Sequence, residues 1–168
     1  MKIVVDTNRI IAALVKDSTT RSILLNKNFK FVTPDYTISE IHEHKDELKA
    51  DANLSDDEFG ILLALVFENI EIIPKSDYET YLDECKNDMS DVDDILVLAV
   101  AIAAKAEAIW AHDPHFKEQK KVKISDMLKK ELLNEWHAYW LSESFLWFLS
   151  LGIKRENLRV RQHLKKEL

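Results

Sequence analysis

The chain has 168 residues, of which 46% are hydrophobic and 32% are charged, and its formal net charge is −7. This length suits one domain with at most a short appendage, and the apolar content predicts a globular protein with a true hydrophobic core. The composition includes only two glycines and three prolines, which argues against a many-stranded all-β fold.

The first half of the chain alternates strand-like and helix-like segments. The β-branched run KIVV at 2–5 predicts a short buried strand of a parallel sheet. After it we expect a helical stretch at 9–28 broken near 17–20, a strand at 29–33 ended by Pro34, one helix at 35–50, and a helix at 54–69 opened by a capping box of Ser55 and Glu58.

The second half continues the same alternation. We expect a strand or extended connector at 70–74, a helix at 78–88, an apolar helix at 90–107 capped by Ser90, strands at 108–111 and 122–124, and a helix at 125–133. Strands that alternate with helices predict an α/β fold on a parallel sheet.

Acidic residues follow the predicted strands or begin the predicted helices. Asp6 and Asp113 directly follow two buried strands, Asp91 and Asp94 begin the helix at 90–107, and Glu40 lies in the helix at 35–50. Sites of open parallel sheets form at the carboxyl ends of the strands. Because neighbouring carboxylates destabilise one another, we expect a divalent cation there, and ligation by oxygen atoms favours Mg²⁺ or Mn²⁺ over zinc.

Each acid also has a plainer interpretation. Asp91, Asp93 and Asp94 suit the positive end of a helix dipole, Asp6 suits a turn or N-cap, Glu40 suits a solvated helix face, and Asp113 suits a turn before Pro114. The histidines do not predict zinc, because His42 and His44 diverge on a helix while His112 and His115 flank a turn without a thiolate.

Taken in order, the blocks IVVDTN, TISEIHEH, DVDDILVLAVA and IWAHDPHF resemble the four acidic blocks of the PIN-domain nucleases, over about residues 1–133. The resemblance implies a three-layer α/β/α fold and a Mg²⁺- or Mn²⁺-dependent ribonuclease that leaves 5′-phosphate products. Many members are toxins of toxin–antitoxin operons, which implies RNA and an antitoxin protein as partners, and members often form homodimers.

Carried over by position, the catalytic and metal-binding acids are Asp6, Glu40, Asp94 and Asp113. Asn8 would orient this cluster, and Asp91 would be an outer ligand. In one departure, Ala111 stands where many members have Ser or Thr, two residues before the last acid.

Two other classes compete with the nuclease. In one, the domain keeps the fold and serves as a catalytically weak or inactive module that binds RNA or protein. In the other, it is a phosphotransfer domain such as a receiver or an aspartate-nucleophile phosphatase. The spacing Asp6-Thr7-Asn8 does not provide the second Asp that such a phosphatase needs.

The C-terminal segment 134–168 differs from the rest of the chain, and we predict that it is an aromatic-rich helical extension of the domain at 1–133. Residues 154–168 carry a net charge of +4, which leaves −11 on residues 1–153. Its aromatic residues could pack on the body or on a second subunit, or they could stack on RNA while Arg155, Arg159 and Arg161 bind phosphates. The segment resembles a fragment of glycyl-tRNA synthetases, notably in the stretch ENLRVRQH. The resemblance implies either a captured gene fragment or a tRNA-binding segment grafted onto the domain. We infer no synthetase activity, because so short a segment cannot form the catalytic core.

The expected location is the cytoplasm, without a membrane segment. The lone Cys85 excludes an internal disulfide framework and is typical of a reduced, intracellular thiol. The N-terminus is a strand-like run rather than a signal peptide, and the apolar run at 95–104 is too short to span a bilayer.

Overall fold

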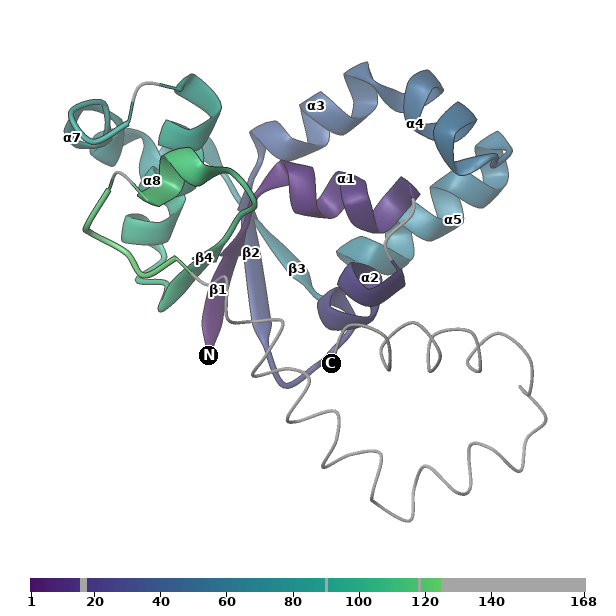
Figure 1. The fold of residues 1–168 in the computed structure, drawn as a ribbon, viewed down its shortest axis with the longest axis horizontal. Helices are drawn as coiled ribbons and strands as arrows, with labels where there is room; N and C mark the ends of the chain where they lie inside the picture. Colours follow the sequence, from purple (N-terminus) through teal and green to yellow (C-terminus); the bar gives the residue numbers. More distant parts are fainter. Residues whose placement is uncertain (16–17, 90, 118, 125–168) are drawn as a thin grey trace, which may run out of the picture. The chain divides into compact units, whose positions relative to one another are not determined.

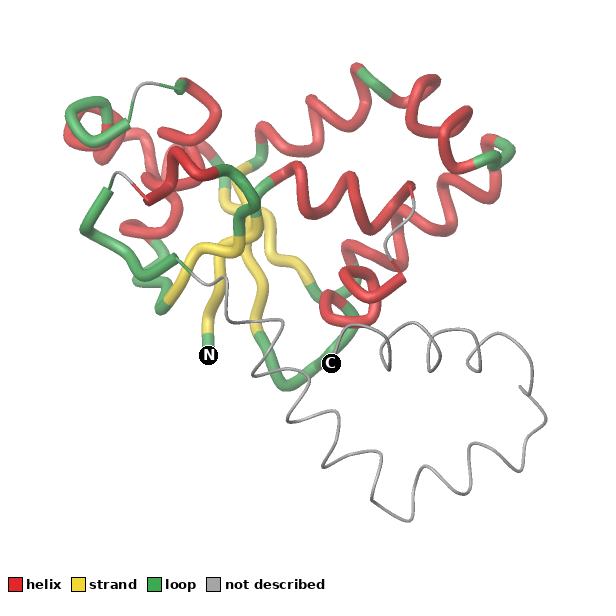
Figure 2. The backbone as a smooth tube through the Cα atoms, viewed as in Figure 1, coloured by secondary structure: helices red, strands yellow, loops and turns green. Residues whose placement is uncertain are grey.

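A four-stranded sheet forms the centre of the protein. The computed structural model describes residues 1–15, 18–89, 91–117 and 119–124, all within one compact unit, Met1–Asp126. Strands β1 (Lys2–Val5), β2 (Lys30–Pro34), β3 (Ile70–Ile73) and β4 (Ala108–Trp110) lie in the order β3-β2-β1-β4 (Figure 2), and every pair is parallel. The predicted strand at 122–124 contributes a single parallel bridge, between Ile109 and Ile124.

Helices cover both faces of this sheet. They are α1 (Thr7–Val15), α2 (Ser18–Leu24), α3 (Tyr36–Glu43), α4 (Lys45–Ala52), α5 (Asp56–Phe67), α6 (Lys75–Tyr78), α7 (Leu82–Cys85) and α8 (Val92–Ala103), with 3₁₀ turns η1 (Glu79–Tyr81) and η2 (Pro114–Lys117). Figure 1 shows α8 on one side of the strands and α1, α2 and α5 on the other. The predicted three-layer α/β/α architecture is therefore confirmed.

Apart from the first residues of β1 and β2, strands β1, β2 and β4 are buried on both faces, which explains why their sequences are largely apolar without alternation. The middle of the edge strand β3, in contrast, is exposed. Val4, Val32 and Ile109 belong to the core cluster that includes α8. Phe31 on β2 and Trp110 on β4, the two strands that flank β1, approach each other with ring centroids 6.2 Å apart. A strand with apolar partners above and below needs no polar face.

The predicted helix at 35–50 is wrong as a single element, because the helix breaks at His44 into α3 and α4. Between the buried Ile41 and Leu48 the chain has six polar residues, so no apolar contact holds a continuous helix there. The break lets Leu48 reach the core from α4, which contacts α1.

Three smaller predictions are also corrected. The segment 78–88 is not one helix but part of a run of short turns, α6, η1 and α7, that begins after Pro74. The N-cap of α8 is Asp91, whose Oδ1 accepts the Asp93 N–H at 2.9 Å, rather than Ser90, which lies outside the described residues. Pro34 does not stop β2 but is its last residue, a position that needs no further N–H for the ladder.

Other predictions hold or lie outside the described residues. The capping box of Ser55 and Glu58 at the start of α5 is confirmed. The predicted helix at 125–133 and the extension at 134–168 fall outside the described residues, and the boundary between them stays a prediction. Within the described part of the chain, no helix has the length and apolar character needed to cross a membrane.

A buried chain of hydroxyls ties the carboxyl ends of β1 and β2 to α1 and α3. Thr33 donates to the Val5 carbonyl at 3.0 Å, Thr37 lies 2.9 Å from Thr33, and Thr7 lies 2.9 Å from Thr37. Because the only proton of Thr33 goes to the carbonyl, Thr37 donates to Thr33. The hydroxyl of Thr7 lies between Thr37 and the Glu40 carboxylate and interacts with both. This chain fixes the helix starts beside the strand ends.

Replacing Thr37 with Val should destabilise the fold by about 1 to 3 kcal/mol, because the variant loses both buried hydrogen bonds of the Thr37 hydroxyl, to Thr33 and to Thr7. Urea denaturation measures the change. The matched control is Thr80→Val, at an exposed position of η1, where we expect a change within about 0.5 kcal/mol. Equal losses in the two variants would contradict the structural role of the hydroxyl chain.

Candidate metal centre

An acidic cavity of about 110 Å³ lies where β1, β2 and α8 meet. Eleven residues line it, and six of them are carboxylates: Asp6, Glu40, Asp91, Asp93, Asp94 and Asp113. No basic residue is among the described residues that line it. The cavity therefore concentrates negative charge at the carboxyl end of the sheet, next to the central strand.

Asp6 lies directly after β1 and is only 6% exposed. Its backbone N–H donates to the Trp110 carbonyl at 3.2 Å, which extends the pairing of β1 with β4 by one residue. Its Oδ2 is buried and has no hydrogen-bond partner among the described residues. Burial, together with the charges of Asp94 and Glu40, raises the pKa of Asp6 to about 7, while a backbone hydrogen bond from Asn8 opposes the shift.

Asp94 lies in the first turn of α8 and is 8% exposed. Burial and the charges of Asp91 and Asp113 raise its pKa to about 6, against the opposing effect of His115. Burial also raises the pKa of Glu40, which lies half-buried on α3. Ionisation of any of these three side chains therefore destabilises the folded state.

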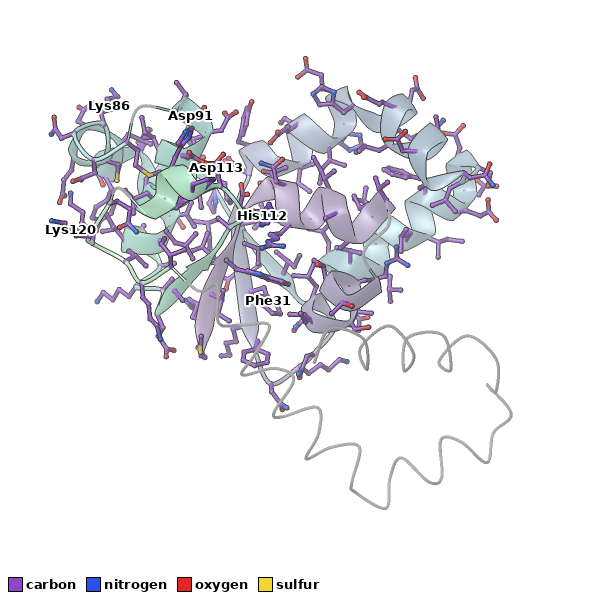
Figure 3. The ribbon with its side chains drawn as sticks, in the orientation of Figure 1. Phe31, Lys86, Asp91, His112, Asp113 and Lys120 are labelled. Carbon is purple, nitrogen blue, oxygen red and sulfur yellow. The ribbon has the colours of Figure 1, made fainter. Side chains whose placement is uncertain are left out.

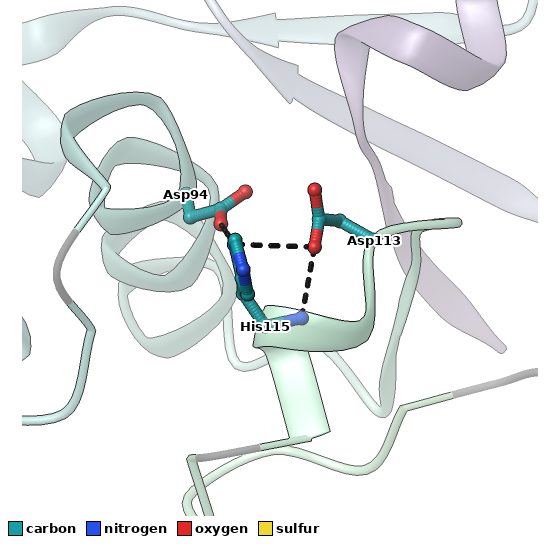
Figure 4. Close-up of side chains that lie close together, drawn as sticks. All are labelled: Asp94, Asp113 and His115. Carbon is teal, nitrogen blue, oxygen red and sulfur yellow. Dashed lines mark hydrogen bonds and ion pairs between the residues drawn. The ribbon is translucent and has the colours of Figure 1, made fainter.

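The segment after β4 carries Asp113 and His115 (Figure 4). The His115 backbone N–H donates to Asp113 Oδ1 at 2.8 Å, an Asx turn that brings the imidazole back over the carboxylate. His115 Nδ1 lies 3.3 Å from Asp113 Oδ1 and 4.0 Å from Asp94 Oδ2. One donor atom from each of these three residues lies within 4.8 Å of the others, an arrangement able to hold a metal ion.

The structure brings together the site residues that were predicted from the sequence. The four acids predicted as catalytic, Asn8 and Asp91 all line the one cavity. Asp91, at the start of α8, and Asp113, after β4, are labelled in Figure 3. Their catalytic and metal-binding roles remain predictions, and Arg155, Arg159 and Arg161 lie outside the described residues.

Sequence reasoning missed several residues at this site. His115 lies beside Asp94 and Asp113, although it is not one of the residues that line the cavity and its spacing had been considered only for zinc. Tyr36 and Asp93 do line the cavity. A signal for His115 was present, because an Asp followed two residues later by any N–H donor favours an Asx turn that places that residue beside the carboxylate. For Tyr36 the only signal is its place directly after the second strand.

Arg9 positions the loop that carries Asp113. Its guanidinium carbon lies 5.6 Å from the centre of the Trp110 ring, a cation–π arrangement. Its Nη2 donates to the Ala111 carbonyl at 3.5 Å and lies 3.3 Å from His112 Nδ1. Arg9 therefore connects α1 to the segment after β4, and it adds a positive charge beside Asp6 that partly offsets the raised pKa.

The donor set fits a divalent cation. Carboxylate oxygens from two strand ends and two helices converge on the cavity, and the buried Asp6 Oδ2 has no protein donor. An ionised carboxylate that is buried without a partner is costly, so a cation is the group that such a site accommodates best. The chemistry of these oxygen atoms suits Mg²⁺ or Mn²⁺.

Solved structures include one with a similar fold. A chain of the crystal structure of VapBC2 from Rickettsia felis, bound to a DNA fragment from their promoter, superposes with a TM-score of 0.59. The match covers 74% of this chain and 98% of that one, at 18% sequence identity. Identity this low shows a common fold and nothing more.

Curated relatives match only over short stretches. The glycine–tRNA ligase of Acetivibrio thermocellus is 59% identical over 34 residues, that of Clostridium tetani 50% over 34, and that of Mycobacterium bovis 35% over 52. These stretches are 20%, 20% and 31% of this chain, which spans only 7%, 7% and 11% of the respective ligases. The predicted resemblance to a synthetase fragment is confirmed as a short one.

The PIN domain family matches residues 4–131, which is well over half of the chain and includes every acid of the cavity. This match indicates the same family as the order of the acidic blocks and is consistent with the parallel sheet. The chain belongs to the PIN domain family.

Proposed function

We propose that this protein is a Mg²⁺- or Mn²⁺-dependent endoribonuclease that hydrolyses RNA phosphodiester bonds at the carboxylate cavity. The observation that carries the proposal is the convergence of six carboxylates on one cavity with a buried, unpaired oxygen of Asp6. Membership of the PIN domain family supports the same chemistry.

Asp6, Asp94 and Asp113 would hold the cation, with Glu40 reaching the same cavity from α3. A divalent cation supplies an activated water at neutral pH and offsets the charge that develops on the phosphate. Asp6 and Asp94 are almost fully buried on a strand end and a helix start, so they keep the site rigid. Glu40, with its raised pKa, is suited to accept the proton of the attacking water.

We also propose an antitoxin protein as a partner, so that the ribonuclease is the toxin of a pair. The support is the fold shared with a chain of the VapBC2 structure, a complex bound to promoter DNA. A homodimer stays a prediction from the family resemblance.

The alternative is a PIN-fold module that binds RNA or protein and cleaves weakly or not at all. Its support is Ala111, which is 1% exposed and brings no hydroxyl to the site. The two proposals differ in a measurable way, because a decayed site should bind Mn²⁺ weakly and show no metal-dependent turnover.

Replacing Asp94 with Asn should reduce Mn²⁺-dependent RNA cleavage by at least about a hundredfold, because the cation loses a buried ligand and the cavity loses a charge. The measurement is cleavage of total RNA with Mn²⁺ and with EDTA. The matched control is Asp57→Asn, an exposed acid in the first turn of α5. Full activity of the Asp94 variant, or equal activity in EDTA, would contradict the proposal.

Asp6→Asn should raise the melting temperature of the metal-free protein by several degrees at pH 8. The pKa of Asp6 is about 7 in the fold and about 3.9 in the unfolded chain. Above pH 7 the carboxylate is charged in both states and the fold carries the cost of burial, whereas below about pH 4 it is protonated in both and the cost is gone. The advantage of the variant should therefore shrink as the pH falls from 7 towards 4.

Thermal denaturation in EDTA at pH 8, 6 and 4.5 measures this difference. Added MgCl₂ at pH 8 should raise the melting temperature of the wild type more than that of the variant, since a bound cation relieves the same cost. Asp57→Asn serves again as the exposed control. Identical melting curves for wild type and Asp6→Asn at pH 8 would show that the buried carboxylate carries no penalty.

The basic C-terminal segment should strengthen RNA binding. Replacing Arg155, Arg159 and Arg161 with Ser, in an Asp94→Asn background that prevents cleavage, should lower the slope of log affinity against log salt by about 2 for single-stranded RNA. Fluorescence anisotropy at several salt concentrations measures the slope. Replacing the exposed Lys75 and Lys123 with Ser is the control, and an unchanged slope in the triple variant would exclude phosphate contacts by these arginines.

A further inference from the structure

His115 adds a nitrogen donor to a site otherwise made of oxygen atoms. Its imidazole lies beside Asp94 and Asp113, two of the six carboxylates of the cavity, as Figure 4 shows. The side chain is 58% exposed, so burial does not explain why it turns back towards the acids. No acidic block of the family resemblance assigns it a role.

We propose that His115 Nδ1 is a ligand of the cation in the carboxylate cavity, and that this nitrogen makes the site prefer Mn²⁺ to Mg²⁺. The inference rests on the cation of the proposed function but not on RNA being the substrate.

The distances suit a shared cation. In a six-coordinate site with bonds of about 2.1 Å, adjacent donors lie about 3.0 Å apart and opposite donors about 4.2 Å apart. His115 Nδ1 lies 3.3 Å from Asp113 Oδ1 and 4.0 Å from Asp94 Oδ2, within that range. The Asx turn at Asp113 fixes the backbone of His115 beside the carboxylate, which keeps the imidazole within reach of a shared cation.

A second observation concerns a buried oxygen of the cavity that receives no hydrogen bond from the described residues. Asp6 is 6% exposed, lines the same cavity as Asp94 and Asp113, and has a buried Oδ2 without a hydrogen bond. Among the described residues, neither His115 nor Arg9 donates a hydrogen bond to that oxygen, and Arg9 turns its guanidinium towards Trp110, Ala111 and His112. A cation held by Asp94, Asp113 and His115 would bring positive charge to this carboxylate.

The donor types determine which cation is preferred. Mg²⁺ binds oxygen ligands and water with little tolerance for other donors, whereas imidazole nitrogen suits first-row transition metals. Mn²⁺ accepts both carboxylate and imidazole. If His115 were only an ion-pair partner of Asp113, its loss would change the affinity for both ions alike through charge.

Pulsed electron paramagnetic resonance of the full-length protein with one equivalent of Mn²⁺ tests the nitrogen directly. We expect a ¹⁴N coupling in the wild type that is absent in His115→Gln and retained in His42→Gln, a control at an exposed position of α3. Calorimetric titration should show Mn²⁺ affinity falling at least about tenfold in His115→Gln, with Mg²⁺ affinity changing less than about threefold.

Bound Mn²⁺ without a ¹⁴N coupling in the wild type would overturn the inference, and so would equal losses of Mn²⁺ and Mg²⁺ affinity in His115→Gln. Melting curves in EDTA verify that the variant is folded. These outcomes leave the ribonuclease proposal standing if RNA is still cleaved. Conversely, a ¹⁴N coupling in a protein that cleaves no RNA would support the ligand and refute the nuclease.

Discussion

Repulsion among buried carboxylates is the constraint on which the site depends. Six acids line one cavity, and two of them, Asp6 and Asp94, are more than nine-tenths buried. Burial and the neighbouring carboxylates raise the pKa of both groups, so the fold disfavours their ionised state. A chain under selection for stability alone would replace these acids with apolar or neutral side chains, so the free energy retained here points to a bound cation.

Rigid elements keep the acids together despite this repulsion. Asp6 extends the central strand through its hydrogen bond to Trp110, and the hydroxyl chain from Thr7 to Thr33 joins the starts of α1 and α3 to the strand ends. The apolar body of α8 packs against the sheet and carries Asp94 in its first turn, where the helix dipole favours negative charge. The free energy gained by packing the hydrophobic core thus offsets the destabilisation caused by the carboxylates of the site.

The sequence predicted the convergence of the acids because parallel strands deliver their carboxyl ends to one edge, a rule that needs only the strand order of the chain. It did not predict features that depend on the local backbone path. The break at His44 follows from polar residues between two apolar anchors, and the cap of α8 fell on Asp91 because an Asp side chain competes with Ser for that position. His115 was missed for the same reason: only the turn after β4, set by Asp113, returns its imidazole to the acids.

The charge of the cavity has a consequence for how RNA is held. One or two divalent cations supply two or four positive charges, fewer than the six carboxylates that line the cavity, so the occupied site still repels a phosphate backbone. A bound cation attracts a phosphate only at close contact, whereas the summed charge of the protein acts on a polyanion over about 8 Å in physiological salt. Under the proposed function, affinity for RNA would therefore come from positive charge elsewhere. Arg9 lies beside the site but is engaged with Trp110 and Ala111. Two stretches of the sequence, 117–130 and 154–168, each contain six basic residues against two acids, so each carries a net charge of +4.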